Sequence, residues 1–283
     1  MNLPLLPDTL LDSLLADDVP FLDLTTHVLG LGSSPGVMTF AARGAMTLAC
    51  AEDAARIIDR TGTETVLHKA SGDPLAAGEP ILTASGPAAA LLRAWKIAQN
   101  LIEAASGIAT EARAIVGAAR AVSPSVSVVC TRKNLPGTKL LSVKAVLAGG
   151  AVPHRLGLSE TILVFAEHRA FLAGLTPKEI VVMARRGAAE KKIVVEVGSL
   201  EEALTWAEAG ADVVQAEKFS PDLVAALSSE LRRSATRPLI AAAGGITAGN
   251  ARDYAAAGAD ILVTSAPYWA KPRDVAVRIE AAS

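Results

Sequence analysis

The chain has 283 residues, of which 51% are hydrophobic but only 4% aromatic, and its formal net charge is −2 at pH 7. This near-neutral balance argues against binding of nucleic acid or a membrane surface through overall charge, so any anion site must come from a local cluster. The abundance of Ala, Val, Leu and Ile favours helices packed closely on parallel strands.

The cysteines, the N-terminal segment and the apolar runs exclude further classes. Cys50 and Cys130 are the only cysteines and have no metal-ligand spacing, which predicts two small core residues in a reducing, cytoplasmic compartment. The first 18 residues are acidic and carry no basic leader, so they predict no secretory signal. No apolar run approaches the roughly 18 residues of a membrane helix.

Residues 1–105 predict a small α+β domain. Gly/Ser/Pro breaks and turn signals separate short apolar pieces, as is typical of such domains. Asp23 followed by Thr25 and Thr26 predicts a helix cap or an interface element. The expected elements are a helix over Pro7–Ala16, a strand over Val37–Ala42, a helix over Glu52–Asp59, a strand over Thr65–Lys69 and a helix from about Pro87 to Ala105.

Residues 106–269 alternate regularly between strand and helix patterns. Thr176 and Ser220 are expected N-caps, each followed by Pro at the first helical position. The expected strands are Val126–Cys130, Ile162–Phe165, Ile193–Glu196, Val213–Ala216, Leu239–Ala242 and Ile261–Thr264. The expected helices are Leu140–Ala148, Pro177–Ala189, Leu200–Ala209, Pro221–Arg232 and Ala248–Ala257.

Two of these units are similar to each other. Ala203–Gln215 and Ala251–Val263 both end their helix with Ala-Gly-Ala-Asp, where Gly can take a left-handed cap before the next strand. A repeated helix–Gly–strand unit predicts a parallel sheet, and no Gly-x-Gly-x-x-Gly fingerprint favours a doubly wound fold. We therefore expect an open parallel α/β barrel of six to seven strands after the small α+β domain, with residues 270–283 packed back on that domain.

Charge is segregated along the chain. Between Ala112 and Ser159 there is no Asp or Glu, but the stretch holds seven Lys or Arg residues. Because working residues of α/β barrels lie at the carboxyl ends of the strands, Arg132, Lys133 and Arg155 are the candidates for an anion site. The seven cations are Arg113, Arg120, Arg132, Lys133, Lys139, Lys144 and Arg155.

Other strand ends complete a candidate site. Glu196 and Glu217 end two neighbouring strands, where they could hold Mg²⁺, stabilise a ribosyl cation or form structural ion pairs. Gly244-Gly245 precedes a helix start and predicts a phosphate loop, with Thr264-Ser265 on the following strand. His154 could donate a proton or bind an anion.

Several of these motifs resemble the quinolinate phosphoribosyltransferase family, also called nicotinate-nucleotide pyrophosphorylases. The resemblance covers nearly the whole chain. The motifs are Ser106–Thr110, Thr131–Lys133 with Pro136-Gly137, and Gly149-Gly150 followed by His154-Arg155. It implies an N-terminal α+β domain, an open α/β barrel, and a dimer or hexamer in which a neighbouring subunit completes each site.

The resemblance also implies a reaction and roles. The family transfers ribose 5-phosphate from phosphoribosyl pyrophosphate to quinolinate with Mg²⁺ and then decarboxylates the product. Glu196 and Glu217 would lie near the ribose and the metal, Lys133 with them at the reacting centre, and Gly244-Gly245 would bind the 5-phosphate. Arg132, Lys133, His154 and Arg155 would line the substrate pocket, with Lys96 reaching it from a neighbour.

Four positions depart from the family pattern. Lys96 stands where the family has Arg, Glu217 where it usually has Asp, and Ala243 where it has Ser, while Phe165 aligns near a family Lys. Replacing Arg by Lys gives up bidentate binding of a carboxylate, so quinolinate would be held less well. The segments Ala94–Lys96, His154–Thr161 and Ser265–Tyr268 resemble the ModD branch, pyrophosphorylase-like proteins associated with molybdenum transport.

The sequence therefore predicts a phosphoribosyltransferase of the ModD type, using phosphoribosyl pyrophosphate, Mg²⁺ and an anionic, nitrogen-containing acceptor. Two alternatives stay open. The first is quinolinate phosphoribosyltransferase itself, acting in NAD biosynthesis. The second is a non-catalytic anion-binding protein linked to molybdate handling.

Overall fold

The chain folds into two compact units. The computed structural model describes residues 3–233 and 237–282. Unit 1 combines the chain up to Arg113 with Leu135–Gly150 and the chain from Pro267 onward, and unit 2 combines Ala114–Asn134 with Ala151–Ala266. The segment Leu135–Gly150 thus lies with the N-terminal part of the chain. The sequence instead predicts two consecutive domains, residues 1–105 and 106–269, with this segment in the second.

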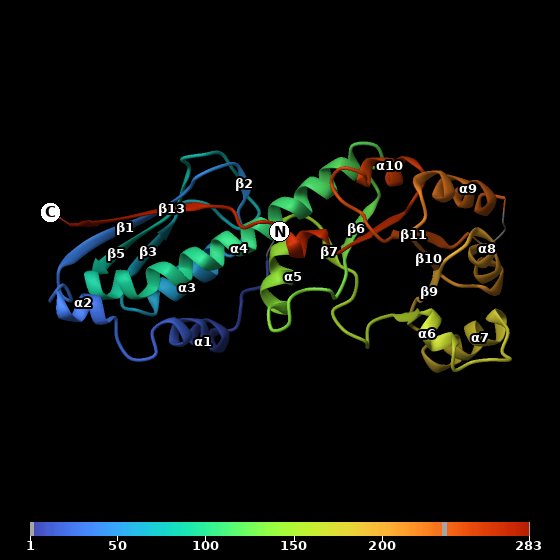
Figure 1. Cartoon of the computed structure of the whole chain (residues 1–283), viewed down its shortest axis with the longest axis horizontal. Helices are drawn as coiled ribbons and strands as arrows, with labels where there is room; N and C mark the ends of the chain where they lie inside the picture. The colour runs from blue at the N-terminus through green and yellow to red at the C-terminus, as the bar shows by residue number, and fades with distance from the viewer. Residues whose placement is uncertain (1–2, 234–236, 283) are drawn as a thin grey trace. The chain divides into compact units, whose positions relative to one another are not determined.

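Unit 1 is built on an antiparallel sheet in the order β13-β1-β5-β3 (Figure 1). Its strands are β1 (Pro35–Ala42), β3 (Glu64–Leu67), β5 (Pro80–Pro87) and β13 (Val275–Ala281), with a two-stranded sheet of β2 (Met46–Thr47) and β4 (Pro74–Leu75). Its helices are α1 (Asp8–Asp18), α2 (Leu24–Val28), α3 (Ala51–Asp59), the first part of α4 (Ala88–Arg120) and α5 (Lys139–Ala148). Alternate residues of β1 are buried, including Met38 and Phe40, and they share one apolar core with Ile57 of α3 and Leu91 of α4.

Helix α4 continues fifteen residues beyond its expected end near Ala105, to Arg120. Ser106 does not break the helix because its hydroxyl is buried and accepts a hydrogen bond from the Ala49 amide at 3.0 Å. Gly107 is needed for close packing: a Cβ there would lie 2.5 Å from the Lys271 carbonyl oxygen. The Gly that looks like a helix end in sequence is therefore a contact point for the backbone before β13.

Unit 2 is a parallel sheet of seven strands in the order β7-β6-β12-β11-β10-β9-β8, with its helices along the outside (Figure 1). The strands are β6 (Ser127–Cys130), β7 (Val152–Pro153), β8 (Ile162–Val164), β9 (Ile193–Val197), β10 (Val213–Glu217), β11 (Leu239–Ala243) and β12 (Ile261–Thr264). The helices are the last part of α4, α6 (Ala166–Arg169), α7 (Pro177–Gly187), α8 (Leu200–Ala209), α9 (Pro221–Leu231) and α10 (Ala251–Ala256). The 3₁₀ turn η1 (Ala266–Trp269) begins at the last residue of unit 2 and continues into unit 1. The two edge strands β7 and β8 do not pair with each other, so the predicted open barrel is confirmed.

The repeated Ala-Gly-Ala-Asp segments have the same role twice. Gly210 and Gly258 take left-handed φ values of 95° and 97°, as predicted. The Asp two residues later begins the turn into the next strand: the Asp212 carboxylate accepts the Ile193 amide at 2.7 Å, and the Asp260 carboxylate accepts the Ile240 amide at 2.9 Å. Each repeat therefore fixes where the neighbouring strand starts, which aligns the carboxyl ends of the strands.

The predicted helix starts are confirmed. The hydroxyls of Thr176 and Ser220 accept the Glu179 and Leu223 amides, both at 3.3 Å. The Asp23 carboxylate caps α2 by accepting a hydrogen bond from the Thr26 amide at 3.2 Å, which is the helix-cap role expected from the sequence. Among the helices that the structure describes, none is both long and apolar enough to cross a bilayer.

Candidate active site

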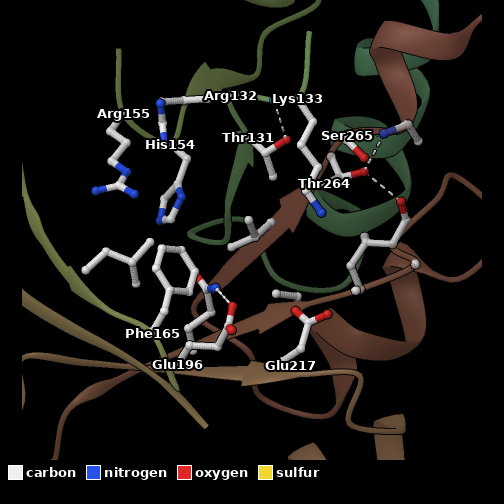
Figure 2. Close-up of a pocket in the computed structure, with 18 of the residues that line it drawn as sticks. Thr131, Arg132, Lys133, His154, Arg155, Phe165, Glu196, Glu217, Thr264 and Ser265 are labelled. Carbon is white, nitrogen blue, oxygen red and sulfur yellow. Dashed lines mark hydrogen bonds between the residues drawn. The ribbon is translucent and has the colours of Figure 1, made fainter. Parts of the chain in front are cut away.

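A cavity of about 330 Å³ lies in unit 2, at the carboxyl ends of the parallel strands. It is lined by Thr131, Arg132, Lys133, His154, Arg155, Leu163, Phe165, Glu196, Gln215, Glu217, Ala243, Gly244, Gly245, Ile246, Thr247, Val263, Thr264, Ser265 and Ala266. Figure 2 shows Arg132, Lys133, His154 and Arg155 across the cavity from Glu196 and Glu217. This is the end of a parallel barrel at which ligand sites are built.

Arg155 is the most unusual of the cations. Its side chain is only 8% exposed, and within residues 3–233 and 237–282 no carboxylate lies within ion-pair distance of it. Its guanidinium carbon lies 5.9 Å from the ring centre of Phe165. Burial and the nearby Arg132 lower the pKa of Arg155. A buried cation without a carboxylate partner is energetically unfavourable, so this position favours the binding of an anion.

The opposite side of the cavity is acidic. Burial and the neighbouring Glu217 raise the pKa of Glu196, whereas a hydrogen bond from Gln215 opposes that shift. The Gln215 side-chain amide donates to Oε2 of Glu196 at 2.9 Å. Two carboxylates that repel each other in a half-buried site favour a cation, or a ligand with positive character, between them.

The third side of the cavity is the loop after β11, which is held by hydrogen bonds. Gly244 and Gly245 have φ values of 90° and 80°. Asn250 holds the loop, since its Oδ1 accepts the Thr247 amide at 2.8 Å and its Nδ2 donates to the Gly245 carbonyl at 2.9 Å. The Thr264 hydroxyl ties β12 to the same loop by donating to the Ile246 carbonyl at 2.7 Å.

Substituting Gly244 by Ala is expected to destabilise unit 2 by about 2–4 kcal/mol, combining the left-handed backbone with overpacking. A Cβ at Gly244 would lie 2.8 Å from Cγ of Lys218 and 3.0 Å from Oε1 of Glu217. The matched control is G245A, where φ is also positive but a Cβ meets nothing within 4 Å. Urea unfolding should rank G244A well below G245A, and equal losses would contradict the packing argument.

We expect His154 to make the stability of the fold depend on pH. Burial and the neighbouring Arg155 lower the pKa of His154 below its ordinary value. Below about pH 6.5 the unfolded chain therefore binds more protons at this residue than the folded chain. The contribution of His154 is complete above that pH and is lost as pH falls through the lower, folded pKa.

We expect the urea midpoint of the wild-type protein to fall between pH 7.5 and pH 5.5, and to fall less in H154N. The other three histidines remain in both proteins. The difference between wild type and H154N in the change of the urea midpoint with pH therefore reports His154 alone. If the urea midpoints of the two proteins change equally with pH, His154 is not buried in its neutral form.

The structure brings together ten of the eleven predicted site residues. The residues that line the cavity are Arg132, Lys133, His154, Arg155, Glu196, Glu217, Gly244, Gly245, Thr264 and Ser265. Lys96 does not line it: this residue is exposed on α4 in unit 1, where its ammonium donates to Gln99 at 2.8 Å and lies 4.4 Å from the Trp95 ring centre.

The acid-free stretch is only partly a site. Arg132, Lys133 and Arg155 line the cavity, but Lys144 is 1% exposed and pairs with the fully buried Asp53 in unit 1. Charge segregation in the sequence therefore indicated the anion site, but it did not predict the buried ion pair that Lys144 forms in unit 1.

Sequence reasoning missed Gln215 as a site residue. It is 4% exposed, lines the cavity and contacts Glu196. The available signal was a lone amide inside the apolar run Val213–Ala216 of a buried strand.

His168 is not a lining residue. Its Nδ1 accepts a hydrogen bond from the Phe165 amide at 3.1 Å, and the two rings stack with centres 5.7 Å apart.

Comparison with known proteins agrees with this geometry. The family model of the quinolinate phosphoribosyl transferase N-terminal domain matches residues 23–106, and that of the C-terminal domain matches residues 108–278. A protein of Rhodobacter capsulatus, named as a ModD pyrophosphorylase, is 52% identical over 87% of this chain and 95% of its own length.

More distant relatives carry the other name of the family. The human nicotinate-nucleotide pyrophosphorylase (carboxylating) is 32% identical over 89% of this chain and 84% of its own length. The crystal structure of NadC from Streptococcus pyogenes superposes with a TM-score of 0.90 at 24% identity, with both chains covered completely, and supports the fold. The chain thus belongs to the quinolinate phosphoribosyltransferase family, whose members are phosphoribosyltransferases, a type of pentosyltransferase, and within it is similar to the ModD pyrophosphorylases.

Proposed function

We propose that the chain transfers the ribosyl 5-phosphate group of phosphoribosyl pyrophosphate to an anionic, nitrogen-containing small molecule, as a pyrophosphorylase of the ModD type. The observation that carries the proposal is Arg155: a buried cation without a carboxylate partner, in the same cavity as Glu196 and Glu217. Anionic groups on one side of the ligand and a developing positive centre on the other would satisfy both sides at once.

Each side of the cavity has a role in this proposal. Arg132 and Lys133 face the pyrophosphate, and the Gly244-Gly245 loop, with Thr264 and Ser265 beside it, faces the 5-phosphate. His154 and Arg155 face a carboxylate of the acceptor. A guanidinium binds a carboxylate through two parallel hydrogen bonds, which orients the acceptor as well as holding it.

The chemistry needs no covalent intermediate. The bond between ribose C1 and the pyrophosphate oxygen breaks, and its electron pair leaves with pyrophosphate. The acceptor nitrogen donates its lone pair to C1 and forms the new C–N bond. Glu196 and Glu217 stabilise the positive character at C1, while the cations of the opposite side stabilise the leaving charge, so catalysis is mainly electrostatic preorganisation.

The carboxylates also fit Mg²⁺. Within the described residues, no cluster of three or more His, Cys, Asp or Glu side chains forms a complete metal site. Glu196 and Glu217 alone suit an ion that is held by one or two carboxylates and completed by substrate phosphates and water. Mg²⁺ bound there would neutralise part of the charge of the pyrophosphate group.

We also propose a dimer or hexamer in the cytoplasm. Lys96 is exposed and lies outside the cavity lining, which is consistent with a role at the site of a neighbouring subunit. Both cysteines are buried and unpaired, and burial raises the pKa of Cys130 to about 12, as expected for core thiols in a reducing compartment.

The decisive experiment measures pyrophosphate release from phosphoribosyl pyrophosphate and Mg²⁺ with a panel of pyridine and related heterocyclic mono- and dicarboxylates. We expect release with a monocarboxylate and little with quinolinate, because Phe165 and Leu163 make one wall of the cavity apolar. Rapid formation of nicotinate mononucleotide from quinolinate would instead assign the enzyme of NAD biosynthesis. Ligand-induced stabilisation without any pyrophosphate release would favour a non-catalytic anion-binding protein.

A further inference from the structure

Gln215 is a polar residue in the middle of the apolar strand β10. It is 4% exposed and pairs in register with Glu196 on the adjacent strand β9. Along β10 side chains alternate, so Val213, Gln215 and Glu217 point to the same face. Val213 belongs to the small apolar core of the barrel, whereas Gln215 and Glu217 line the cavity. Gln215 is therefore the first polar layer above the apolar interior.

The two ends of the Gln215 amide differ. Its nitrogen donates to Oε2 of Glu196 at 2.9 Å, the bond drawn as a dashed line to Glu196 in Figure 2. Its carbonyl oxygen, Oε1, is buried and has no hydrogen-bond partner among the residues that the structure describes. Buried side-chain oxygens in folded proteins almost always have a donor, so an orphaned one that lines a cavity points to a missing ligand group.

The surroundings decide what kind of group this is. Glu196 and Glu217 are acceptors when ionised, so the floor formed by β9 and β10 offers oxygen acceptors beside Oε1. The cations Arg132, Lys133 and Arg155 lie on the opposite side. A ligand that satisfies both sides must present hydroxyl donors to the floor and its anionic groups to the cations. Phosphoribosyl pyrophosphate has this polarity, with ring hydroxyls between its 5-phosphate and its pyrophosphate.

We propose that Gln215 is a specificity-determining residue, whose Oε1 accepts a hydrogen bond from a ring hydroxyl of the bound ribosyl phosphate. This inference rests on the proposed function. Oε1 is buried, but the terminal torsion of a Gln side chain has a broad energy well, so a small rotation would turn the oxygen toward a ligand in the cavity.

The test compares the binding of ribose 5-phosphate, 2-deoxyribose 5-phosphate and 3-deoxyribose 5-phosphate by calorimetry. The wild-type protein should bind ribose 5-phosphate about tenfold more tightly than at least one deoxy analogue, equivalent to about 1.4 kcal/mol. In Q215M, which keeps the length of the side chain but removes its acceptor, this preference should vanish. Inorganic pyrophosphate, which has no ring hydroxyl, should bind both proteins equally and thereby report that Q215M is folded.

Two further variants separate the alternatives. Q215L provides a second apolar replacement in case Met packs poorly. R120M is the matched control, because Arg120 is exposed and lies outside the cavity lining, and it should retain the preference for ribose. A preference that persists in Q215M and Q215L, or one that R120M also loses, would overturn the role of Gln215. Failure of the wild-type protein to bind any ribosyl phosphate would reject the proposed function as well.

Discussion

Replacing Lys144 with Met is expected to lower the free energy of unfolding of unit 1 by about 3 kcal/mol, because it leaves a buried carboxylate without its main cation. Lys144 is 1% exposed and its ammonium contacts Asp53, which is fully buried, with Glu52 at 3.6 Å. Asp53 keeps two donors in the variant: the Leu6 amide at 2.9 Å and Arg56 at 3.1 Å. These remaining bonds limit the loss.

Amide hydrogen exchange of α3 and α5 measures the effect in unit 1 directly. The matched control is K139M, since Lys139 is an exposed lysine at the start of the same helix and should change stability by less than about 0.5 kcal/mol. The double variant K144M/D53N removes the unpaired charge and should recover part of the loss. Equal exchange rates in K144M and K139M would mean that the ion pair contributes nothing net.

Replacing Arg155 with Met is expected to reduce kcat/KM for ribosyl transfer at least about 100-fold, while the free protein becomes no less stable. The two effects differ in sign because Arg155 is a buried cation whose electrostatic partner, in the proposed function, is the substrate. Removing it would abolish the proposed contact to the acceptor, but it would also relieve the unfavourable burial that lowers the pKa of Arg155 and the repulsion from Arg132. Met retains much of the packing against Phe165.

The conservative variant R155K tests geometry against charge. It should recover less than the full activity, because an ammonium cannot form the two parallel bonds of a guanidinium. R120M is the control, since Arg120 is exposed at the end of α4 and lies outside the cavity lining. Steady-state kinetics and thermal unfolding on the same samples give both readouts. A large loss of stability in R155M would identify Arg155 as structural.

Much of unit 2 could be predicted from the sequence because its signals are local. Thr176-Pro177 and Ser220-Pro221 start helices through contacts that span three residues. The Ala-Gly-Ala-Asp repeats end helices and start strands within one segment. The carboxyl ends of parallel strands meet at one edge of the sheet, so listing the polar residues at those ends was enough to name most of the lining.

Other features were decided only by the tertiary structure, since they depend on residues far apart in the chain. Gly107 looks like a break, yet it continues α4 because a backbone more than 160 positions later packs against it. Lys144 lies in the acid-free stretch together with the cations of the cavity, yet its partner is Asp53, 91 positions away. The edge strand β7 is too short to show a pattern of alternating apolar and polar residues in the sequence. Its pairing with β6 nevertheless brings His154 and Arg155 to the cavity.

The sequence by itself determined the family, the alternation of strands and helices, and the types of polar side chain at the strand ends, because each of these depends on residues that are close together in the chain. The tertiary structure decided which cations share a cavity and which are buried elsewhere, and it revealed the unpartnered oxygen of Gln215. The physical reason is that burial and hydrogen-bond satisfaction are properties of a residue's spatial neighbours, and a linear pattern specifies those neighbours only where they are also near in the chain.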